Sequence, residues 1–277
     1  LQQGCAIALT ARNFFDRGFW DFLRASAPTS FGGVPYHYEI LRKLRFWRMA
    51  LSSLHTLTQA GGRMEPALSR EFAEHCAERR IRYYTMYGQA EATARMSYLA
   101  PEFALEKCGS IGKPIPGGEF WLEDERGERI ESSGSSGQLV YRGANVTMGY
   151  AQGHADLARP DESGGVLRTG DLAQRDDDGF YYITGRLKRF LKLFGHRVNL
   201  QEIEQLLLAR GHVAVCAGED DRLAVYLCAS DGPTALAAKQ MLVDILKTPA
   251  SAIVIYVIDS LPRNEAGKIL YGELAHC

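Results

Sequence analysis

Two strand-like segments in the first hundred residues end in glycine turns, and this feature restricts the fold more than any other. The first segment, residues 54–62, ends in a pair of glycines, and the second, residues 82–88, ends in Tyr87 and Gly88. Open α/β sheets bind ligands where strands run into such turns. The pattern therefore predicts a layered α/β region with a ligand site at one edge of its sheet.

Further helices and strands are expected around these two segments, because apolar residues at helical spacing alternate with short extended runs. From Gly109 to Thr184 the runs are short and are broken by Gly, Pro and Asp, which indicates a small antiparallel or barrel-like β unit. The basic stretch at 41–48 has apolar residues at helical spacing, which favours a buried helix face over a membrane-surface helix. The expected helices are 13–24, one starting at Pro35, 66–80, 200–209 and 234–247. Residues 1–9 are expected to be a helix end that runs through Gly4 into a buried strand. The other expected strands are a short strand and turn at 28–33, then 139–143, 180–184, a hairpin at 187–198, a pair near 212–229, and 252–258.

The composition excludes several classes of function. The 277 residues are 46% hydrophobic and 23% charged, which is typical of a soluble globular protein with room for two domains. The 32 basic and 33 acidic side chains give a net charge of −1, so no overall field attracts nucleic acid or an anionic membrane. No apolar run reaches the roughly 20 residues that cross a bilayer. Six scattered cysteines without CxxC spacing, and no signal peptide, predict a cytoplasmic location.

Four short motifs carry groups that suit a nucleotide. They are Tyr-Gly-Gln-Ala-Glu at 87–91, Leu-Arg-Thr-Gly-Asp at 167–171, Tyr-Ile-Thr-Gly-Arg at 182–186 and Pro-Arg-Asn-Glu-Ala-Gly-Lys-Ile at 262–269. In this order they resemble motifs of the adenylate-forming superfamily of acyl-CoA synthetases, adenylation domains of peptide synthetases and luciferases. The resemblance covers nearly the whole chain, which looks like only the C-terminal portion of such an enzyme.

The fold that the resemblance implies is α/β, with a partial layered large domain, a β-barrel-like subdomain and a small α+β lid. Residues 1–108 are expected to form the C-terminal part of the large domain, 109–186 its β subdomain, and 187–277 the mobile C-terminal domain. The family's Ser/Thr/Gly-rich phosphate loop is absent. The serine- and glycine-rich run at 132–137 imitates such a loop, but a strand rather than a helix follows it, so a flexible turn is expected. The chain begins with Leu1 rather than Met, and it is expected to be part of a longer polypeptide.

Asp171 and Arg186 are the candidates for binding ribose. An ionised carboxylate only accepts hydrogen bonds, so Asp171 suits two sugar hydroxyls. Arg186 follows 186 − 171 = 15 residues later, across an expected hairpin, and would add a donor. A plain salt bridge across the hairpin is the alternative, and the resemblance favours the ribose role for both residues.

The two glycine turns resemble the turns that hold adenine in this superfamily. Glycine permits close approach of the backbone to a base, and an aromatic ring supplies a flat face. Ordinary turns are the alternative for either motif alone. The candidates are Gly61, Gly62, Tyr87, Gly88 and Gln89.

Glu91 is the candidate magnesium ligand that the resemblance implies. Magnesium is commonly held by one or two carboxylates together with phosphate and water, so one glutamate is sufficient. The preceding residue departs from the family pattern, because Ala90 replaces a threonine whose hydroxyl meets the phosphates. This change loses a hydrogen bond that contributes about 0.5–1.5 kcal/mol. Reduced turnover is expected rather than loss of binding.

Three further roles follow from the resemblance. Lys268 matches the lysine that contacts the carboxylate and the α-phosphate during adenylation, where an ammonium group offsets the repulsion between two anions. Lys188 matches the hinge position about which the small domain rotates. Gly195 belongs to the region that approaches the thiol of pantetheine.

The predicted function is therefore that of an AMP-forming ligase, which activates a carboxylic acid with ATP and transfers it to a thiol. The implied cofactors are ATP or AMP, Mg²⁺, and CoA or the phosphopantetheine of a carrier protein. The implied partners are a small carboxylic acid, CoA or a carrier protein, and the missing N-terminal portion of the enzyme; neither nucleic acid nor a membrane span is expected. An idle adenylate-binding or regulatory homologue and a structural interaction module remain open. The acyl pocket candidates are Phe31, Gly32, Val34, Tyr36 and His37, of which His37 suits the core equally well.

Overall fold

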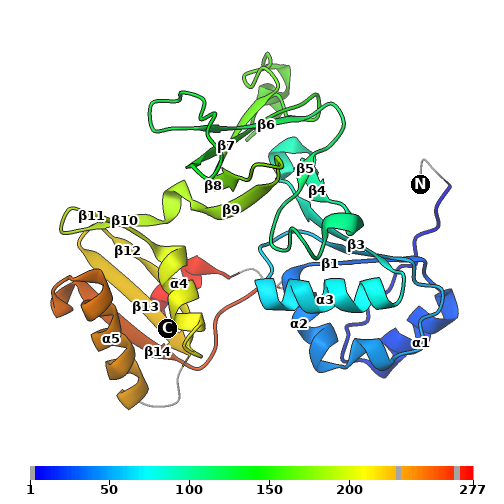
Figure 1. Ribbon diagram of the computed structural model, residues 1–277, viewed down its shortest axis with the longest axis horizontal. Coiled ribbons are helices and arrows are strands. Elements are labelled where there is room, and N and C mark those ends of the chain that lie inside the picture. The colour runs from blue at the N-terminus through cyan, green and yellow to red at the C-terminus, as the bar shows by residue number, and fades with distance from the viewer. Residues whose placement is uncertain (1–3, 229–231, 265–268, 277) are drawn as a thin grey trace. The chain divides into compact units, whose positions relative to one another are not determined.

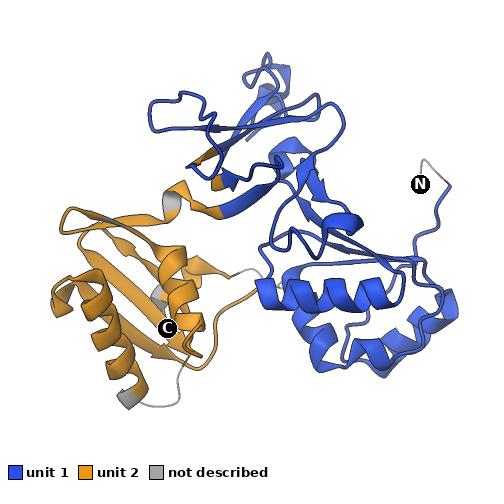
Figure 2. Cartoon of the chain, in the orientation of Figure 1, with its two compact units in different colours: residues 1–135, 139–169, 174–183 blue, residues 136–138, 170–173, 184–277 orange. Residues whose placement is uncertain are grey.

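The chain forms two compact units (Figure 2). The computed structural model describes residues 4–228, 232–264 and 269–276. The three-part division predicted from the sequence stays a prediction. Unit 1 contains residues 1–135, 139–169 and 174–183, and unit 2 contains residues 136–138, 170–173 and 184–277.

A five-stranded sheet and three helices make up the first part of unit 1 (Figure 1). The strands lie in the order β1-β2-β3-β4-β5, with the first three parallel and the last two antiparallel to their neighbours. A core of aromatic and aliphatic side chains, including Leu57, Phe72 and Tyr83, packs helices against the sheet. The elements are α1 (Arg17–Ser26), β1 (Ser30–Gly33), α2 (Pro35–Lys43), β2 (Thr56–Gln59), α3 (Pro66–Glu78), β3 (Arg82–Tyr87), β4 (Ser97–Leu99) and β5 (Lys113–Pro114).

Local sequence signals set where these helices begin. Pro35 and Pro66 occupy the first positions of α2 and α3, where a missing N–H costs nothing. The carboxylate of Glu65 accepts from two backbone N–H groups at the start of α3. The helix expected at 13–24 begins later, at Arg17, because Asp16 caps it by accepting from the N–H of Gly18 at 2.7 Å.

The basic stretch at 41–48 lies partly in α2 and partly in a short helical turn. Ile40 and Leu41 are buried, as expected for a helix that packs on the core. The described helices are all too short or too polar to span a membrane.

The strand expected at 1–9 is wrong for the residues that the structure describes. Residues 4–13 belong to no helix or strand, and Ile7 and Leu9 are exposed. A strand needs a neighbour to satisfy its backbone N–H and C=O groups. Within the described residues no strand pairs with this segment.

A four-stranded sheet follows, in the order β6-β7-β8-β9. Its outer strands, β6 and β9, do not pair with each other in the described chain, so the sheet is open and the expected barrel does not close. The α/β class itself is confirmed. The strands are β6 (Glu119–Glu123), β7 (Ser136–Arg142), β8 (Val166–Arg175) and β9 (Tyr181–Arg186).

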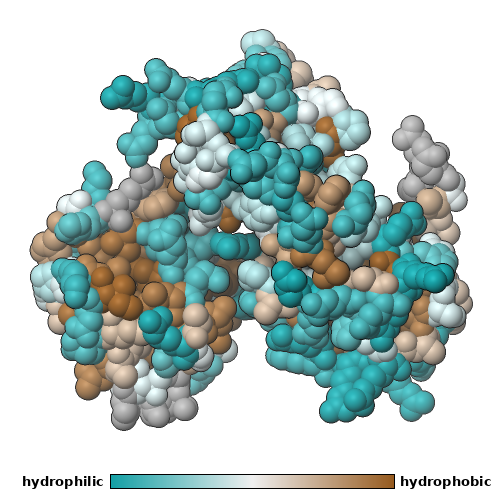
Figure 3. Space-filling view, viewed as in Figure 1, coloured by the Kyte–Doolittle hydropathy of each residue, from teal (hydrophilic) through white to brown (hydrophobic). Residues whose placement is uncertain are grey.

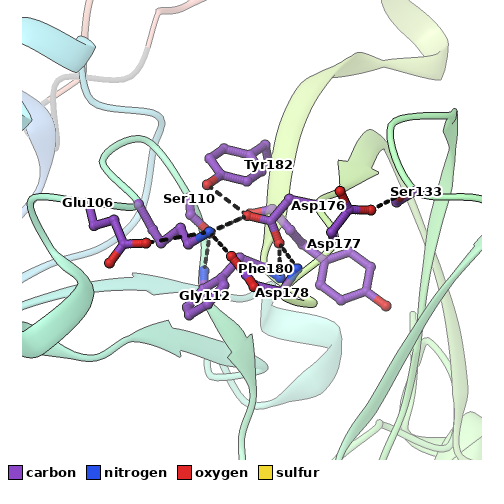
Figure 4. Close-up of polar contacts among 11 residues, drawn as sticks. Glu106, Ser110, Gly112, Ser133, Asp176, Asp177, Asp178, Phe180 and Tyr182 are labelled. Carbon is purple, nitrogen blue, oxygen red and sulfur yellow. Dashed lines mark hydrogen bonds and ion pairs between the residues drawn. The ribbon is translucent and has the colours of Figure 1, made fainter.

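A mostly buried lysine in the loop before β5 pairs with the turn between β8 and β9, and Figure 4 shows the aspartates of that turn, Asp176 and Asp178. Lys107, whose side chain is 13% exposed, donates to Asp176 at 3.1 Å and also bonds Asp178, both in the turn between β8 and β9. The two carboxylates raise the pKa of Lys107. Burial would raise the pKa of Asp176, but the N–H of Phe180 and the ammonium of Lys107 outweigh it and lower that pKa.

Unit 2 is a smaller α+β structure with its own core. A hairpin of β10 and β11 precedes a three-stranded sheet in the order β12-β13-β14, and helices α4 and α5 pack on that sheet through leucine-rich faces. On the face seen in Figure 3, hydrophobic side chains gather beside α5, where Leu236 is 70% exposed. The elements are β10 (Phe190–Leu193), β11 (His196–Asn199), α4 (Leu200–Leu208), β12 (Val213–Glu219), β13 (Arg222–Cys228), α5 (Gly232–Leu246) and β14 (Ile253–Ile258).

Replacing the buried lysine should make unit 1 more sensitive to acid. A lowered pKa of Asp176 contributes stability above its unfolded value of about 3.9, and this contribution is lost as the pH falls through the folded pKa. Lys107→Met removes one of the interactions that lower the pKa of Asp176, so the acid-unfolding midpoint should move to higher pH. Tryptophan fluorescence reports this transition, since all three tryptophans lie in unit 1.

The matched control is Lys43→Met. Lys43 is an exposed lysine of α2 for which the described part of the chain provides no ion pair. Equal midpoints for the two variants would contradict the role of Lys107.

Candidate functional site

The predicted adenine turns follow neighbouring strands. Strands β2 and β3 are parallel and directly paired, so the turns that follow them lie at the same edge of the sheet. Gly61 has φ +81°, which favours glycine. The amide of Gln59, which is 1% exposed, donates to the carbonyl of Gly62 at 2.7 Å and holds this turn.

The second turn is packed closely against its own chain. A Cβ at Gly88 would lie 2.6 Å from the backbone of Ala94, so glycine is required there by the fold of the loop itself. Tyr87 meets the ring of Phe120 with centroids 6.3 Å apart, and Gln89 donates to the carbonyl of Thr169 at 3.0 Å. The adenine role of these residues stays a prediction.

Glu91 lies in a short helical turn, Ala90–Ala92, and is partly buried. Its Oε1 accepts a hydrogen bond from the hydroxyl of Tyr150 at 2.7 Å, which raises the pKa of that tyrosine. No group of three or more metal-binding side chains occurs in the described residues. A single oriented carboxylate still fits an ion whose other ligands are phosphate and water.

Tyr150 is a residue of this site that sequence reasoning missed. It lies 59 positions from Glu91 and is 73% exposed. No local pattern in the sequence relates the two residues, because only the fold brings the segment after β7 against the turn after β3. A backbone hydrogen bond joins the same two segments, because the N–H of Thr147 donates to the carbonyl of Glu91 at 2.7 Å.

Asp171 and Arg186 lie side by side in unit 2. Asp171 is in β8 and Arg186 ends β9, and the Nε of Arg186 donates to Oδ1 of Asp171 at 2.7 Å. The carboxylate is buried, with 5% of its side chain exposed, whereas the side chain of Arg186 is 62% exposed. A buried carboxylate must be paired or hydrogen-bonded. The pair therefore has a structural role in the hairpin, and its ribose role stays a prediction.

The predicted hinge is a short helical turn, Leu187–Arg189, directly after β9. It places the backbone of Lys188 between β9 of the four-stranded sheet and β10 of the two-stranded hairpin. The side chain of Lys188 is outside what the structure describes. Its pivot role stays a prediction.

Gly195 lies at the tip of the hairpin between β10 and β11. The two turn residues, Phe194 and Gly195, have φ of +50° and +86°, as a tight two-residue hairpin turn requires. Asp221 supports this turn by accepting from the N–H of Phe194 at 2.6 Å. The thiol-approaching role of Gly195 stays a prediction.

The predicted catalytic lysine, Lys268, lies outside the described residues. The described residues on either side of it pair with each other, since Arg263 and Ile269 form an antiparallel bridge. The N–H of Leu270 donates to the carbonyl of Pro262 at 2.9 Å. These contacts define the base of the segment but not the lysine itself.

His37, a candidate for the acyl pocket, lies in the first turn of α2. Burial lowers its pKa, and its ring packs edge-on against Phe14 with centroids 4.9 Å apart. Phe31 packs against the hydrophobic core of unit 1. These contacts account for both residues as core residues, and an acyl pocket stays a prediction.

Comparison with characterised proteins relates the chain to CoA ligases. It is 32% identical to the 2-succinylbenzoate–CoA ligase of Geobacillus kaustophilus (strain HTA426) over 74% of this chain and 43% of that protein. It is 26% identical to acyl-CoA ligase clz12 of Cochliobolus lunatus over 95% of this chain and 78% of that protein. The chain spans about half the length of the bacterial relatives that it matches.

Comparison with solved structures also relates the chain to a coenzyme A synthetase. The O-succinylbenzoate coenzyme A synthetase from Bacillus subtilis in complex with AMP superposes with a TM-score of 0.70 and 25% identity, over 93% of this chain and 53% of that one. The same synthetase has also been solved in complex with ATP and magnesium ion. That structure is 24% identical to this chain, with a TM-score of 0.68 over 93% of this chain and 54% of that one. At this identity the likeness shows the fold alone.

The family model of AMP-binding enzymes matches residues 1–151. This match covers more than half of the 277 residues. The chain therefore belongs to the AMP-binding enzyme family, within the adenylate-forming superfamily.

Proposed function

We propose that this chain is part of an AMP-forming ligase that activates a carboxylic acid with ATP and transfers the acyl group to the thiol of CoA. The relatives named as CoA ligases support CoA as the acceptor, ahead of a carrier protein. The observation that carries the proposal is the contact between Asp171 and Arg186, because two motifs that resemble ribose-binding motifs meet at 2.7 Å.

The chemistry requires each charged group to meet a different part of the nucleotide. Asp171 accepts from ribose hydroxyls, since an ionised carboxylate only accepts hydrogen bonds and suits two sugar hydroxyls. Glu91, oriented by Tyr150, is the carboxylate for Mg²⁺ on the phosphates. The acid's oxygen attacks the α-phosphorus and pyrophosphate leaves; the ammonium of Lys268 stabilises the charge that develops on these oxygens.

An idle adenylate-binding homologue is the second candidate, and Ala90 favours it. Threonine at this position would donate to the phosphates, whereas alanine has no hydroxyl. Pyrophosphate exchange and AMP binding together distinguish a ligase, an adenylate-binding protein and an inert module.

The decisive experiment is pyrophosphate exchange into ATP, with a panel of acids that includes 2-succinylbenzoate, by the longer polypeptide that this chain is proposed to be part of. The Bacillus subtilis synthetase serves as the positive control. Acid-dependent exchange is expected, and Lys268→Ala should abolish it while AMP binding measured by calorimetry is retained. No exchange with intact AMP binding would favour the idle homologue, and the absence of both would favour the inert module.

Asp171→Asn should weaken AMP binding at least about tenfold, because a hydrogen bond to a charged group contributes about 1.5–3 kcal/mol. Isothermal titration calorimetry measures the affinity. The control is Glu123→Gln, since Glu123 is an equally buried carboxylate, 5% exposed, that Arg168 pairs at 2.8 Å. Equal loss of AMP affinity in both variants would show a general effect on folding and would contradict a specific ribose role.

Glu91→Gln should remove the part of ATP affinity that depends on Mg²⁺. The amide keeps an acceptor for Tyr150 but lacks the negative charge that a hard cation requires. Titration of ATP with and without Mg²⁺ measures the difference, and AMP without metal is the internal control. Unchanged dependence on Mg²⁺ would rule out Glu91 as the ligand.

A further inference from the structure

A cluster of polar groups around a mostly buried arginine lies at the end of the predicted hinge turn, and the proposed reaction does not use it. The Arg189 cluster consists of Arg189, Glu204, Cys216 and Tyr271, all in unit 2. Arg189 ends the hinge turn, Glu204 lies in α4, Cys216 lies in β12, and Tyr271 begins the last helical turn, Tyr271–His276. Four separate segments of the unit therefore meet at one guanidinium group.

Hydrogen bonds fix the guanidinium group of Arg189 on one side. Its Nη2 bonds the carboxylate of Glu204 and donates to the carbonyl of Cys216 at 3.1 Å. The N–H of Cys216 donates to the same carboxylate oxygen at 2.7 Å, which closes the network. The side chains of Arg189 and Glu204 are only 17% and 16% exposed. Burial raises the pKa of Glu204, an effect that the charge of Arg189 opposes.

The ring of Tyr271 supplies the remaining contact. The guanidinium carbon lies 4.7 Å from the ring centroid, within the range of a cation–π interaction. The Nε of Arg189 is buried and has no acceptor within the described residues. Hydrogen bonds through Nη2 and the aromatic face therefore hold this guanidinium in place.

Tyr271 follows the predicted catalytic lysine by 271 − 268 = 3 positions. Two described residues lie between them. Ile269 pairs with Arg263, and the N–H of Leu270 donates to the carbonyl of Pro262. Leu274, in the same turn as Tyr271, is 1% exposed and packs in a small core with Val215. The segment is thus joined to the body of unit 2 at its core and to the hinge turn through Tyr271.

We propose that Tyr271 is a positioning residue, which ties the C-terminal segment to the hinge turn through the face of its ring on Arg189. The orientation of the residues that flank Lys268 then follows that of the hinge turn, because both are held by the same guanidinium group. The catalytic consequence rests on the proposed function, whereas the contact itself does not.

Tyr271→Leu is the test variant, because it removes the ring and keeps an apolar side chain that can fill its place. Substitution of Arg189 is less informative, since it would leave the buried carboxylate of Glu204 without its partner. Tyr271→Phe keeps the ring and is the matched control. Tyr98→Leu removes another partly exposed tyrosine ring, 37% against 44% exposed, in unit 1.

The first measurement is hydrogen–deuterium exchange of the amides in residues 269–276. Exchange should be on the order of threefold to tenfold faster in Tyr271→Leu, as loss of a cation–π contact of ordinary strength predicts. Tyr271→Phe and Tyr98→Leu should exchange as the unmodified chain does. Unchanged exchange in Tyr271→Leu, or equally fast exchange in Tyr271→Phe, would overturn the proposal.

The second measurement is pyrophosphate exchange, which tests the consequence for the reaction. Tyr271→Leu should lower kcat and leave KM for ATP unchanged, since the residue acts on the lysine segment and not on nucleotide binding. Normal kcat together with faster amide exchange would disprove the positioning role. If the unmodified longer polypeptide does not adenylate, the proposed function fails, and amide exchange still decides whether the contact between Tyr271 and Arg189 holds the segment.

Discussion

The second half of the chain is organised by the need to pair one buried carboxylate. Asp171 is 3% exposed within β8, and an unpaired charge at such a position would be strongly destabilising. Arg186 satisfies it from the end of β9, which fixes how these two strands meet and where the chain leaves the sheet for the hinge turn. The same pair is the one proposed to hold ribose. The proposal thus assigns folding and binding to the same two groups, so substitution effects on the two properties must be separated by a buried pair elsewhere, such as Glu123 with Arg168.

Two mostly buried cations also pair with carboxylates and join separate segments of the chain. Lys107 joins the loop before β5 to the turn between β8 and β9 through Asp176 and Asp178, and Arg189 joins the hinge turn of unit 2 to α4, β12 and the C-terminal turn. Each cation is mostly buried and contacts segments far apart in sequence. Because breaking a buried pair leaves an uncompensated charge, these contacts give the units defined internal geometry.

Features that local interactions determine, such as helix starts, could be predicted from the sequence. Features that depend on contacts between distant segments could not. The helix starts predicted at Pro35 and Pro66 are confirmed, because a proline acts within the first turn of a helix. The first helix starts at Arg17 instead of residue 13, because Asp16 caps it. The strand at 1–9 was predicted from its apolar residues alone, but a strand also needs a partner, which the described chain does not provide. Closure of a barrel likewise depends on whether the outer strands pair, which no local pattern encodes.

The sequence alone determined the family, the α/β class, and the identities of the groups suited to a nucleotide, because these are carried by short motifs with fixed spacing. Only the tertiary structure decided which of those groups meet. It paired Asp171 with Arg186, placed Tyr150 on Glu91 from 59 residues away, and assembled Arg189, Glu204 and Tyr271 around one guanidinium group. The reason is physical: the motifs specify chemistry residue by residue, whereas contacts between distant segments depend on how strands pair and how buried charges find partners.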